Sequence, residues 1–123
     1  MKILAVDDDQ LVLLPLQKKI QELGYKVMIA DNAKKGIELF DSFKPHLVIV
    51  DMNMPETSGF EFIEHLRVNK RSSTPIIVLS GYNNTEIISE TFKLGINDYI
   101  IKSNNFDDLH SRIKRVNIFF QIQ

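Results

Sequence analysis

The strongest fold signal in this sequence is the stretch His46-Leu-Val-Ile-Val-Asp51-Met-Asn-Met-Pro55-Glu-Thr-Ser-Gly59. Its apolar residues at positions 47–50 run without a break into a carboxylate, and proline and glycine then end the regular pattern. A short, continuous, β-branched run bounded by turn residues is typical of a strand that is buried on both faces. Asp51 is therefore expected at the carboxyl end of a buried strand, where open parallel α/β sheets collect their ligands.

Further short apolar runs share this character, and a helical pattern follows each one. The expected strands cover residues 3–6, 25–30, 47–50, 75–79 and 99–101. After each of them, apolar residues recur at steps of three and four, which is the spacing of an amphipathic helix. This alternation predicts an α/β fold, with a doubly wound, five-stranded parallel sheet flanked by five helices. We expect the flavodoxin-like strand order 2-1-3-4-5, although the pattern alone does not fix that order.

Residues near the expected helix starts agree with this division of the chain. Asp9, Asn32 and Ser58 each precede a helical pattern, and each can cap it with a side-chain oxygen. Pro15 lies early in the first helix, where it would remove a backbone hydrogen bond. We therefore expect either a kink at Pro15 or a regular helix that starts near Leu14.

Length and composition limit the kind of protein. The 123 residues fit one compact domain, which we expect to span residues 1–123. The formal net charge of -1 gives no overall field that would attract nucleic acid or an anionic membrane. The absence of cysteine excludes disulfides, thiolate metal sites and cysteine nucleophiles. Neither a signal peptide nor a membrane span is visible, so we expect a cytoplasmic domain with no direct nucleic-acid or membrane partner.

Polar side chains follow four of the expected strands directly. Asp7 and Asp8 follow the first strand, Asp51 the third, Ser80 the fourth and Lys102 the fifth. Because parallel strands bring their carboxyl ends to the same edge of a sheet, we expect these side chains to share one pocket. Three carboxylates held close together repel one another unless a cation lies among them. Oxygen ligands without histidine or cysteine suit a hard cation such as Mg²⁺.

The same pocket would contain groups that bind and accept a phosphoryl group. Lys102 offers a charge-assisted donor for phosphate, and Ser80 offers a hydroxyl donor. Asp51 is then a candidate nucleophile of the aspartyl-phosphate kind. Each residue also has an ordinary explanation by itself, since such acids often cap helices or lie in turns and a lone lysine usually faces solvent. Their combination at four strand ends favours a phosphoryl site over these separate explanations.

The ordered set of motifs resembles the receiver domain of bacterial two-component response regulators. Any one motif is weak, but together they occur in the family's order and cover essentially the whole chain. The resemblance implies a signalling domain that catalyses only its own phosphorylation and dephosphorylation. The matching pieces are Val6-Asp7-Asp8, Asp51 with Met54-Pro55 and Gly59, Leu79-Ser80-Gly81, and Asp98-Tyr99-Ile-Ile-Lys102.

The resemblance implies a role for each acid. Asp51 would take a phosphoryl group from a sensor histidine kinase or a histidine phosphotransfer protein. Mg²⁺ would be bound by the side chains of Asp8 and Asp51 and by the backbone carbonyl of Asn53. Asp7 would reach the metal through water.

The resemblance also implies how the phosphoryl group is held and sensed. Ser80 and Lys102 would hold its oxygens as catalytic groups, and Ser80 would move together with Tyr99 as a switch. Tyr99 matches the family's aromatic switch residue. The surface affected would be the fourth helix, the fifth strand and the fifth helix, where an output partner or a second copy of the chain would dock.

Two sets of positions qualify this resemblance. The family usually has a proline after the lysine, often on a cis peptide, but Ser103 follows Lys102 here. We expect this peptide to be trans, because a cis bond before a non-proline residue costs about 2.5–4 kcal/mol. Asn53 and Tyr82 lie two residues beyond Asp51 and Ser80, and we expect them to tune the lifetime of the phosphorylated state.

Other functions also remain open from the residues. The Asp7-Asp8-Asp9 run has the spacing of a haloacid-dehalogenase-like phosphatase, in which Asp7 would be the nucleophile and Asp9 its acid–base partner. That interpretation gives Asp51 no role, and the chain lacks the length for a cap. A receiver-like binding module that no longer accepts phosphate is a third possibility, against which the intact acids argue. A flavodoxin is disfavoured because the acidic loop would repel a flavin phosphate.

Overall fold

The five strands form one parallel sheet with the order β2-β1-β3-β4-β5, as predicted. The computed structural model describes residues 1–52, 58–102 and 106–122, with the side chains of 1–52, 58–102 and 106–117. Within these ranges the helices predicted after each strand are present, and a short π-helical segment, η1, continues the third. The elements are β1 Lys2–Val6, α1 Gln10–Glu22, β2 Lys26–Ala30, α2 Ala33–Phe43, β3 Leu47–Val50, α3 Gly59–Glu64, η1 His65–Asn69, β4 Ile76–Ser80, α4 Thr85–Phe92, β5 Asp98–Ile101 and α5 Leu109–Ile122.

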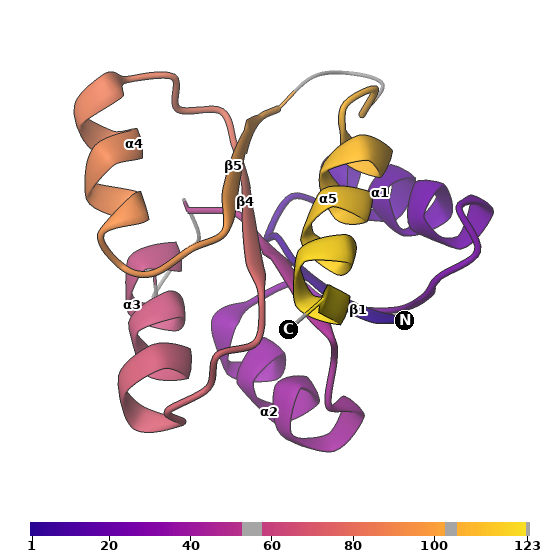
Figure 1. The fold of residues 1–123 in the computed structure, drawn as a ribbon, viewed down its shortest axis with the longest axis horizontal. Coiled ribbons are helices and arrows are strands. Elements are labelled where there is room, and N and C mark those ends of the chain that lie inside the picture. The colour runs from indigo at the N-terminus through magenta and orange to yellow at the C-terminus, as the bar shows by residue number, and fades with distance from the viewer. Residues whose placement is uncertain (53–57, 103–105, 123) are drawn as a thin grey trace.

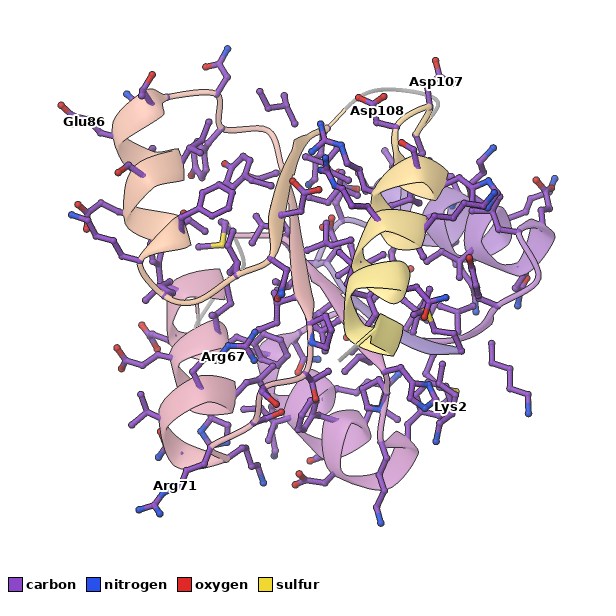
Figure 2. The ribbon with its side chains drawn as sticks, in the orientation of Figure 1. Lys2, Arg67, Arg71, Glu86, Asp107 and Asp108 are labelled. Carbon is purple, nitrogen blue, oxygen red and sulfur yellow. The ribbon has the colours of Figure 1, made fainter. Side chains whose placement is uncertain are left out.

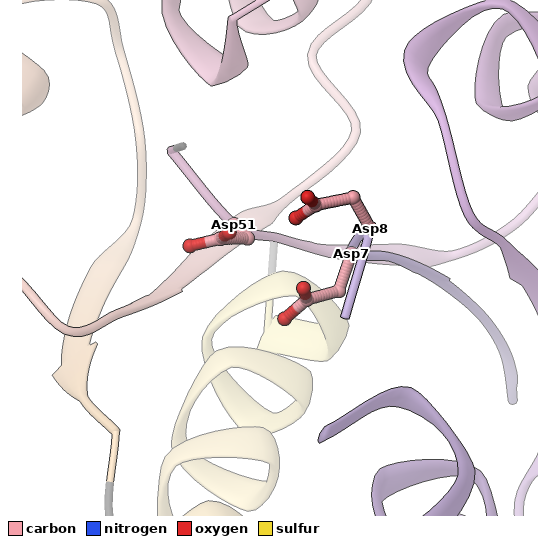
Figure 3. Close-up of side chains that lie close together, drawn as sticks. All are labelled: Asp7, Asp8 and Asp51. Carbon is pink, nitrogen blue, oxygen red and sulfur yellow. The ribbon is translucent and has the colours of Figure 1, made fainter. Parts of the chain in front are cut away.

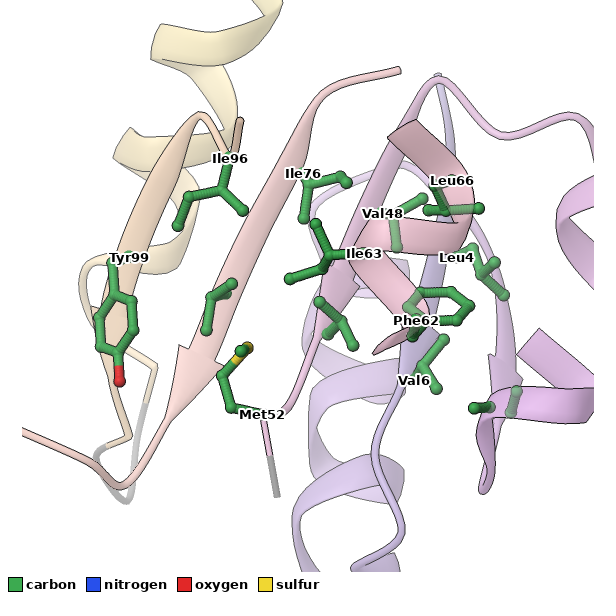
Figure 4. Packing of buried hydrophobic residues seen from close by; sticks show 14 residues of the cluster. Leu4, Val6, Val48, Met52, Phe62, Ile63, Leu66, Ile76, Ile96 and Tyr99 are labelled. Carbon is green, nitrogen blue, oxygen red and sulfur yellow. The ribbon is translucent and has the colours of Figure 1, made fainter. Parts of the chain in front are cut away.

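The sheet separates two apolar cores, which explains the continuous apolar run of β3. Val48 and Val50 lie in the core shared with α2, α3 and α4, which Figure 4 shows from close by. Leu47 and Ile49 lie in the core shared with α1 and α5. Figure 1 shows α1 and α5 on one side of the sheet, and α3 and α4 on the other. A strand with helices on both faces needs apolar residues at every position, and all of β3 is buried.

The edge strands are less apolar. β2 pairs only with β1 among the described strands, and its residues alternate between exposed and half-buried until Ala30. Partial exposure of this kind is typical of a strand at the edge of a sheet. In the described residues no helix combines the length and the apolar character needed to cross a membrane.

Side-chain caps start the helices as expected. Asp9 accepts a hydrogen bond from the Leu11 N–H at 2.9 Å, and Asn32 accepts one from the Lys35 N–H at 2.8 Å. Ser58 accepts one from the Glu61 N–H at 3.3 Å. Each cap satisfies a backbone donor in the first turn that has no intrahelical acceptor.

One local feature differs from the sequence prediction, and two others add to it. α1 begins at Gln10 and runs through Pro15, so a regular start near Leu14 is wrong. α5 begins at Leu109, because Phe106 has a φ of +55° that a helix does not allow. Phe92 belongs to the apolar pattern of α4, yet 45% of it is exposed.

Candidate functional site

Backbone hydrogen bonds fix the positions of the predicted site residues at the carboxyl edge of the sheet. The Asp7 N–H donates to the Ala30 carbonyl at 3.1 Å, and the Asp51 N–H donates to the Val6 carbonyl at 3.0 Å. The Lys102 N–H donates to the Ser80 carbonyl at 2.8 Å. The sheet ladder therefore continues one residue past the strands and brings their following side chains together.

Three carboxylates meet at this edge, as Figure 3 shows. Asp7, Asp8 and Asp51 can each place one oxygen so that the three oxygens lie within 4.8 Å of one another. Asp7 and Asp51 are buried, whereas Asp8 is exposed. Their donor set is purely carboxylate oxygen, which fits a hard divalent cation approached from the solvent side of Asp8.

Asp9 is turned away from this group. Its carboxylate accepts the Leu11 N–H at the start of α1, while its own N–H donates to Oδ1 of Asp7 at 2.9 Å. The backbone of Asp9 thus orients the Asp7 carboxylate, and its side chain caps the helix. This geometry gives Asp9 no acid–base position beside Asp7, so it does not support the phosphatase alternative.

The ammonium of Lys102 lies between two of the acids. Its Nζ is 3.1 Å from Oδ2 of Asp7 and 3.4 Å from Oδ1 of Asp51. Burial lowers the pKa of Lys102, but the charges of Asp51 and Asp7 outweigh that effect and hold it above its ordinary value. Burial is also the largest influence on Asp7, and it raises the pKa of that carboxyl despite the favourable contacts with the Asp9 N–H and Lys102.

A small pocket of about 240 Å³ opens beside these charges. It is lined by Asp51, Ser80, Gly81, Tyr82 and Lys102. Ser80 is fully buried, and its Oγ accepts a hydrogen bond from the Tyr82 N–H at 3.2 Å. The pocket therefore combines a carboxylate, a hydroxyl and an ammonium, as the sequence predicted.

The side chain of Tyr99 contacts the loop that follows β4. Its ring is part of the apolar core, and its hydroxyl donates to the Tyr82 carbonyl at 2.8 Å. Figure 4 shows the ring projecting from β5. The backbone N–H and carbonyl of Tyr82 are thus bonded to the side chains of Ser80 on β4 and Tyr99 on β5.

Gly59 has a structural role that the sequence motif did not reveal. A Cβ at this position would lie 2.5 Å from the backbone oxygen of Asp51 and 2.5 Å from Cα of Met52. The Gly59 N–H also donates to the Met52 carbonyl at 3.0 Å. The start of α3 therefore packs directly on the backbone that carries Asp51. The sequence motif included this glycine. Its contact with Asp51 joins residues eight positions apart, so the local sequence pattern does not show it.

Two of the predicted positions lie outside the described residues. They are Asn53, expected to offer its carbonyl to the metal and to tune the phosphorylated state, and Ser103, whose peptide with Lys102 was expected to be trans. The Met54-Pro55 part of the family motif lies outside them as well.

Comparisons with known proteins agree with this geometry. A family model described as the response regulator receiver domain matches residues 3–114. The sensory transduction protein BceR of Halalkalibacterium halodurans is 32% identical over 115 residues, which are 94% of this chain and 49% of that protein. The chain spans about half the length of the curated relatives it matches.

Solved structures show the same fold. The chemotaxis protein CheY4 of Vibrio cholerae has a TM-score of 0.87 at 28% identity, covering 94% of this chain and 97% of that chain. TrrA of Thermotoga maritima, solved in complex with Mg²⁺ and BeF, has a TM-score of 0.83 at 33% identity, with the same coverage. Taken with the family match over nearly the whole length, these findings show that the chain belongs to the receiver domain family of two-component response regulators.

Proposed function

We propose that Asp51 is the residue that accepts a phosphoryl group in this signalling domain. The observation that carries the proposal is the placement of the Asp51 carboxylate in a pocket that also holds Ser80 and Lys102. A sensor histidine kinase or a histidine phosphotransfer protein would be the donor. An oxygen of Asp51 attacks the phosphorus, the bond to the donor's imidazole nitrogen breaks, and the nitrogen keeps that electron pair.

The chain's own groups stabilise this transfer. The Lys102 ammonium, already 3.4 Å from Asp51, can follow the added oxygens and offset their charge. The Ser80 hydroxyl, on the next strand, can donate to one of them. The domain would assist only its own phosphorylation and the later hydrolysis. Tyr82 lines the pocket and is 41% exposed, so it would hinder the approach of water and thereby set the lifetime of the phosphorylated state.

The acid group would hold Mg²⁺ during these steps. Asp8 and Asp51 would bind it by their side chains, Asp7 through water, and Asn53 by its backbone carbonyl. When bound, Mg²⁺ would supply positive charge beside the phosphoryl oxygens. Support comes from the all-oxygen donor set of Asp7, Asp8 and Asp51 and from the open side at Asp8.

The phosphoryl group would be sensed through the backbone N–H and carbonyl of Tyr82. Ser80 now accepts the Tyr82 N–H, so a hydroxyl recruited by phosphate oxygens would change that contact. Tyr99 holds the carbonyl of the same residue, which links the change to β5. The surface of α4, β5 and α5 would then bind an output partner or a second copy of the chain. Phe92 and Ile101 are 45% and 48% exposed on α4 and β5, which suits such a role.

Phosphoryl mapping tests the central proposal. Incubation with acetyl phosphate and Mg²⁺, followed by peptide mass spectrometry, should place a single phosphoryl group on Asp51. Asp51→Asn should abolish it. Asp9→Asn, which keeps a capping oxygen on α1, should be labelled like the wild type. Labelling that persists in Asp51→Asn would overturn the proposal.

A further inference from the structure

Arg67 joins three segments through its guanidinium. It lies on η1, directly after α3, and is labelled in Figure 2. Its Nε and Nη2 donate to the Gly95 carbonyl at 3.1 and 2.9 Å, and its Nη1 donates to the Ser72 carbonyl at 3.0 Å. One side chain therefore ties the end of the third helical segment and the loop after it to the loop between α4 and β5.

The bonded carbonyl lies just beyond the end of α4. Gly95 has a φ of +90°, and its N–H donates to the Phe92 carbonyl at 3.0 Å. Two residues later, Asn97 exchanges two hydrogen bonds with Ile76, its N–H donating at 2.8 Å and its Oδ1 accepting at 2.9 Å. The C-terminal end of α4 is thus fixed to both η1 and the first residue of β4.

The rest of α4 has few buried residues. Among residues 85–92, Thr91 is the one buried residue, while Ile87 and Ile88 are half-buried. The loop that enters the helix depends on Tyr82, whose N–H and carbonyl are bonded to Ser80 and Tyr99. One end of α4 therefore depends on the phosphoryl pocket, and the other depends on Arg67.

We propose that Arg67 is a positioning residue that makes the Gly95 end of α4 a fixed pivot, so that a change at Tyr82 swings the N-terminal end of the helix. The inference rests on the proposed phosphoryl switch and adds its mechanical anchor. Without the anchor, the same change would loosen the whole helix and the loop after it. The surface of α4, β5 and α5 would then no longer take up one defined arrangement after phosphorylation.

The chemistry of arginine suits this role. Its planar fork can donate to two carbonyls in fixed directions, whereas the three N–H donors of a lysine ammonium share one freely rotating nitrogen. A charge-assisted bond to a carbonyl is stronger than a neutral one. Arg67→Met keeps the apolar stem and removes every donor, and Arg67→Lys restores the charge and N–H donors on one nitrogen without the planar fork.

Amide hydrogen exchange, measured with and without Mg²⁺ and beryllofluoride, tests the pivot. In the wild type, beryllofluoride should change exchange in residues 81–88 and leave residues 93–97 unchanged. In Arg67→Met, residues 93–97 should exchange about tenfold faster before beryllofluoride is added, because a charged hydrogen-bond donor is lost. Beryllofluoride should then change exchange in both segments, and Arg67→Lys should recover part of the wild-type pattern.

Lys70→Met is the matched control. Lys70 follows η1 and forms an ion pair with Asp41 of α2 at 2.8 Å, so its loss should leave residues 93–97 unchanged. Beryllofluoride-induced changes of equal size in residues 81–88 and 93–97 of the wild type would overturn the pivot. An Arg67→Met variant with the wild-type pattern would do the same. The absence of any change at residues 81–88 in the wild type would instead count against the switch itself.

Discussion

The ammonium of Lys102 stands 3.4 Å from Oδ1 of Asp51, within the reach of a direct ion pair. A divalent cation bound by Asp51 must share this carboxylate with Lys102 or displace it. Removal of the ammonium should therefore strengthen Mg²⁺ binding while weakening phosphoryl transfer. We expect Lys102→Met to bind Mg²⁺ roughly fivefold more tightly, since a like charge near the ion is worth about 1 kcal/mol in a solvated site.

Isothermal titration calorimetry can measure that affinity, and acetyl phosphate labelling can measure the transfer rate. Lys93→Met is a suitable control, because Lys93 pairs with exposed Glu90 at 3.0 Å on α4. Weaker Mg²⁺ binding in Lys102→Met would mean that the lysine positions the acids and does not compete with the metal.

Asp7 should cost the folded state stability at neutral pH. Because burial holds its folded pKa above the ordinary value, its contribution is most favourable below about pH 4 and is lost as the pH rises through the folded pKa. Asp7→Asn has no carboxyl to titrate, so its stability does not fall in this way as the pH rises. Its melting temperature without Mg²⁺ should exceed that of the wild type by roughly 2–5 °C at pH 7, with a smaller gap at pH 4.

Thermal unfolding followed by circular dichroism across this pH range checks the prediction. Addition of Mg²⁺ should stabilise the wild type more than the variant, because the variant has lost one of the three carboxylates. A variant that melts below the wild type at pH 7 without Mg²⁺ would show that the Asp7–Lys102 ion pair outweighs the cost of burial.

Asp98 should stabilise the folded state at neutral pH, the opposite of the effect expected for Asp7. Burial raises its pKa, but the bonds from Arg112 and Arg115, both at 2.7 Å, outweigh burial and leave the pKa below its ordinary value. Its stabilisation is therefore present above about pH 4 and is lost as the pH falls through the folded pKa. Asp98→Asn should cost about 1–2 kcal/mol at pH 7, a modest figure because Arg115 is largely in solvent.

Urea unfolding at pH 7 and at pH 3 can test this sign. The difference between Asp98→Asn and the wild type should shrink at the lower pH. A difference that stays constant with pH would contradict the prediction, because the amide oxygen of Asp98→Asn can still accept the bond from the Tyr99 N–H and the variant differs from the wild type chiefly in its missing charge.

Gly59 should tolerate no side chain. The Cβ of Gly59→Ala would press on backbone atoms of Asp51 and Met52, which cannot rotate away as a side chain can. We expect a loss of about 2 kcal/mol, within the usual range for overpacking, and slower labelling of a displaced Asp51. Gly81→Ala is the control for stability, because its Cβ would meet no atom within 4 Å. Equal stability of the two variants would show that α3 can shift freely.

The strand pattern predicted most of the fold, because burial on both faces leaves a continuous apolar run that few other structures produce. The strand ends then brought Asp7, Asp8, Asp51, Ser80 and Lys102 together through parallel topology alone. Each of these inferences depends on local composition and on a general rule of sheet architecture.

Features that depend on contacts across loops were not visible in the sequence. The π-helical turn at residues 65–69 continues the apolar spacing of α3, so nothing in the pattern separates the two. Arg67 resembles any exposed helical arginine until the position of the Gly95 carbonyl is known. Phe92 fits the helical period of its neighbours, yet 45% of it is exposed on α4.

The consecutive acids Asp7, Asp8 and Asp9 face three different environments, namely the core, the solvent and the first turn of α1. Their side chains therefore have separate roles, although the Asp9 N–H also holds Oδ1 of Asp7. Exchange of Asp9 for another capping residue should alter the thermal tolerance of the domain and leave the carboxylates of Asp7, Asp8 and Asp51 in place, because the backbone N–H that holds Asp7 is kept.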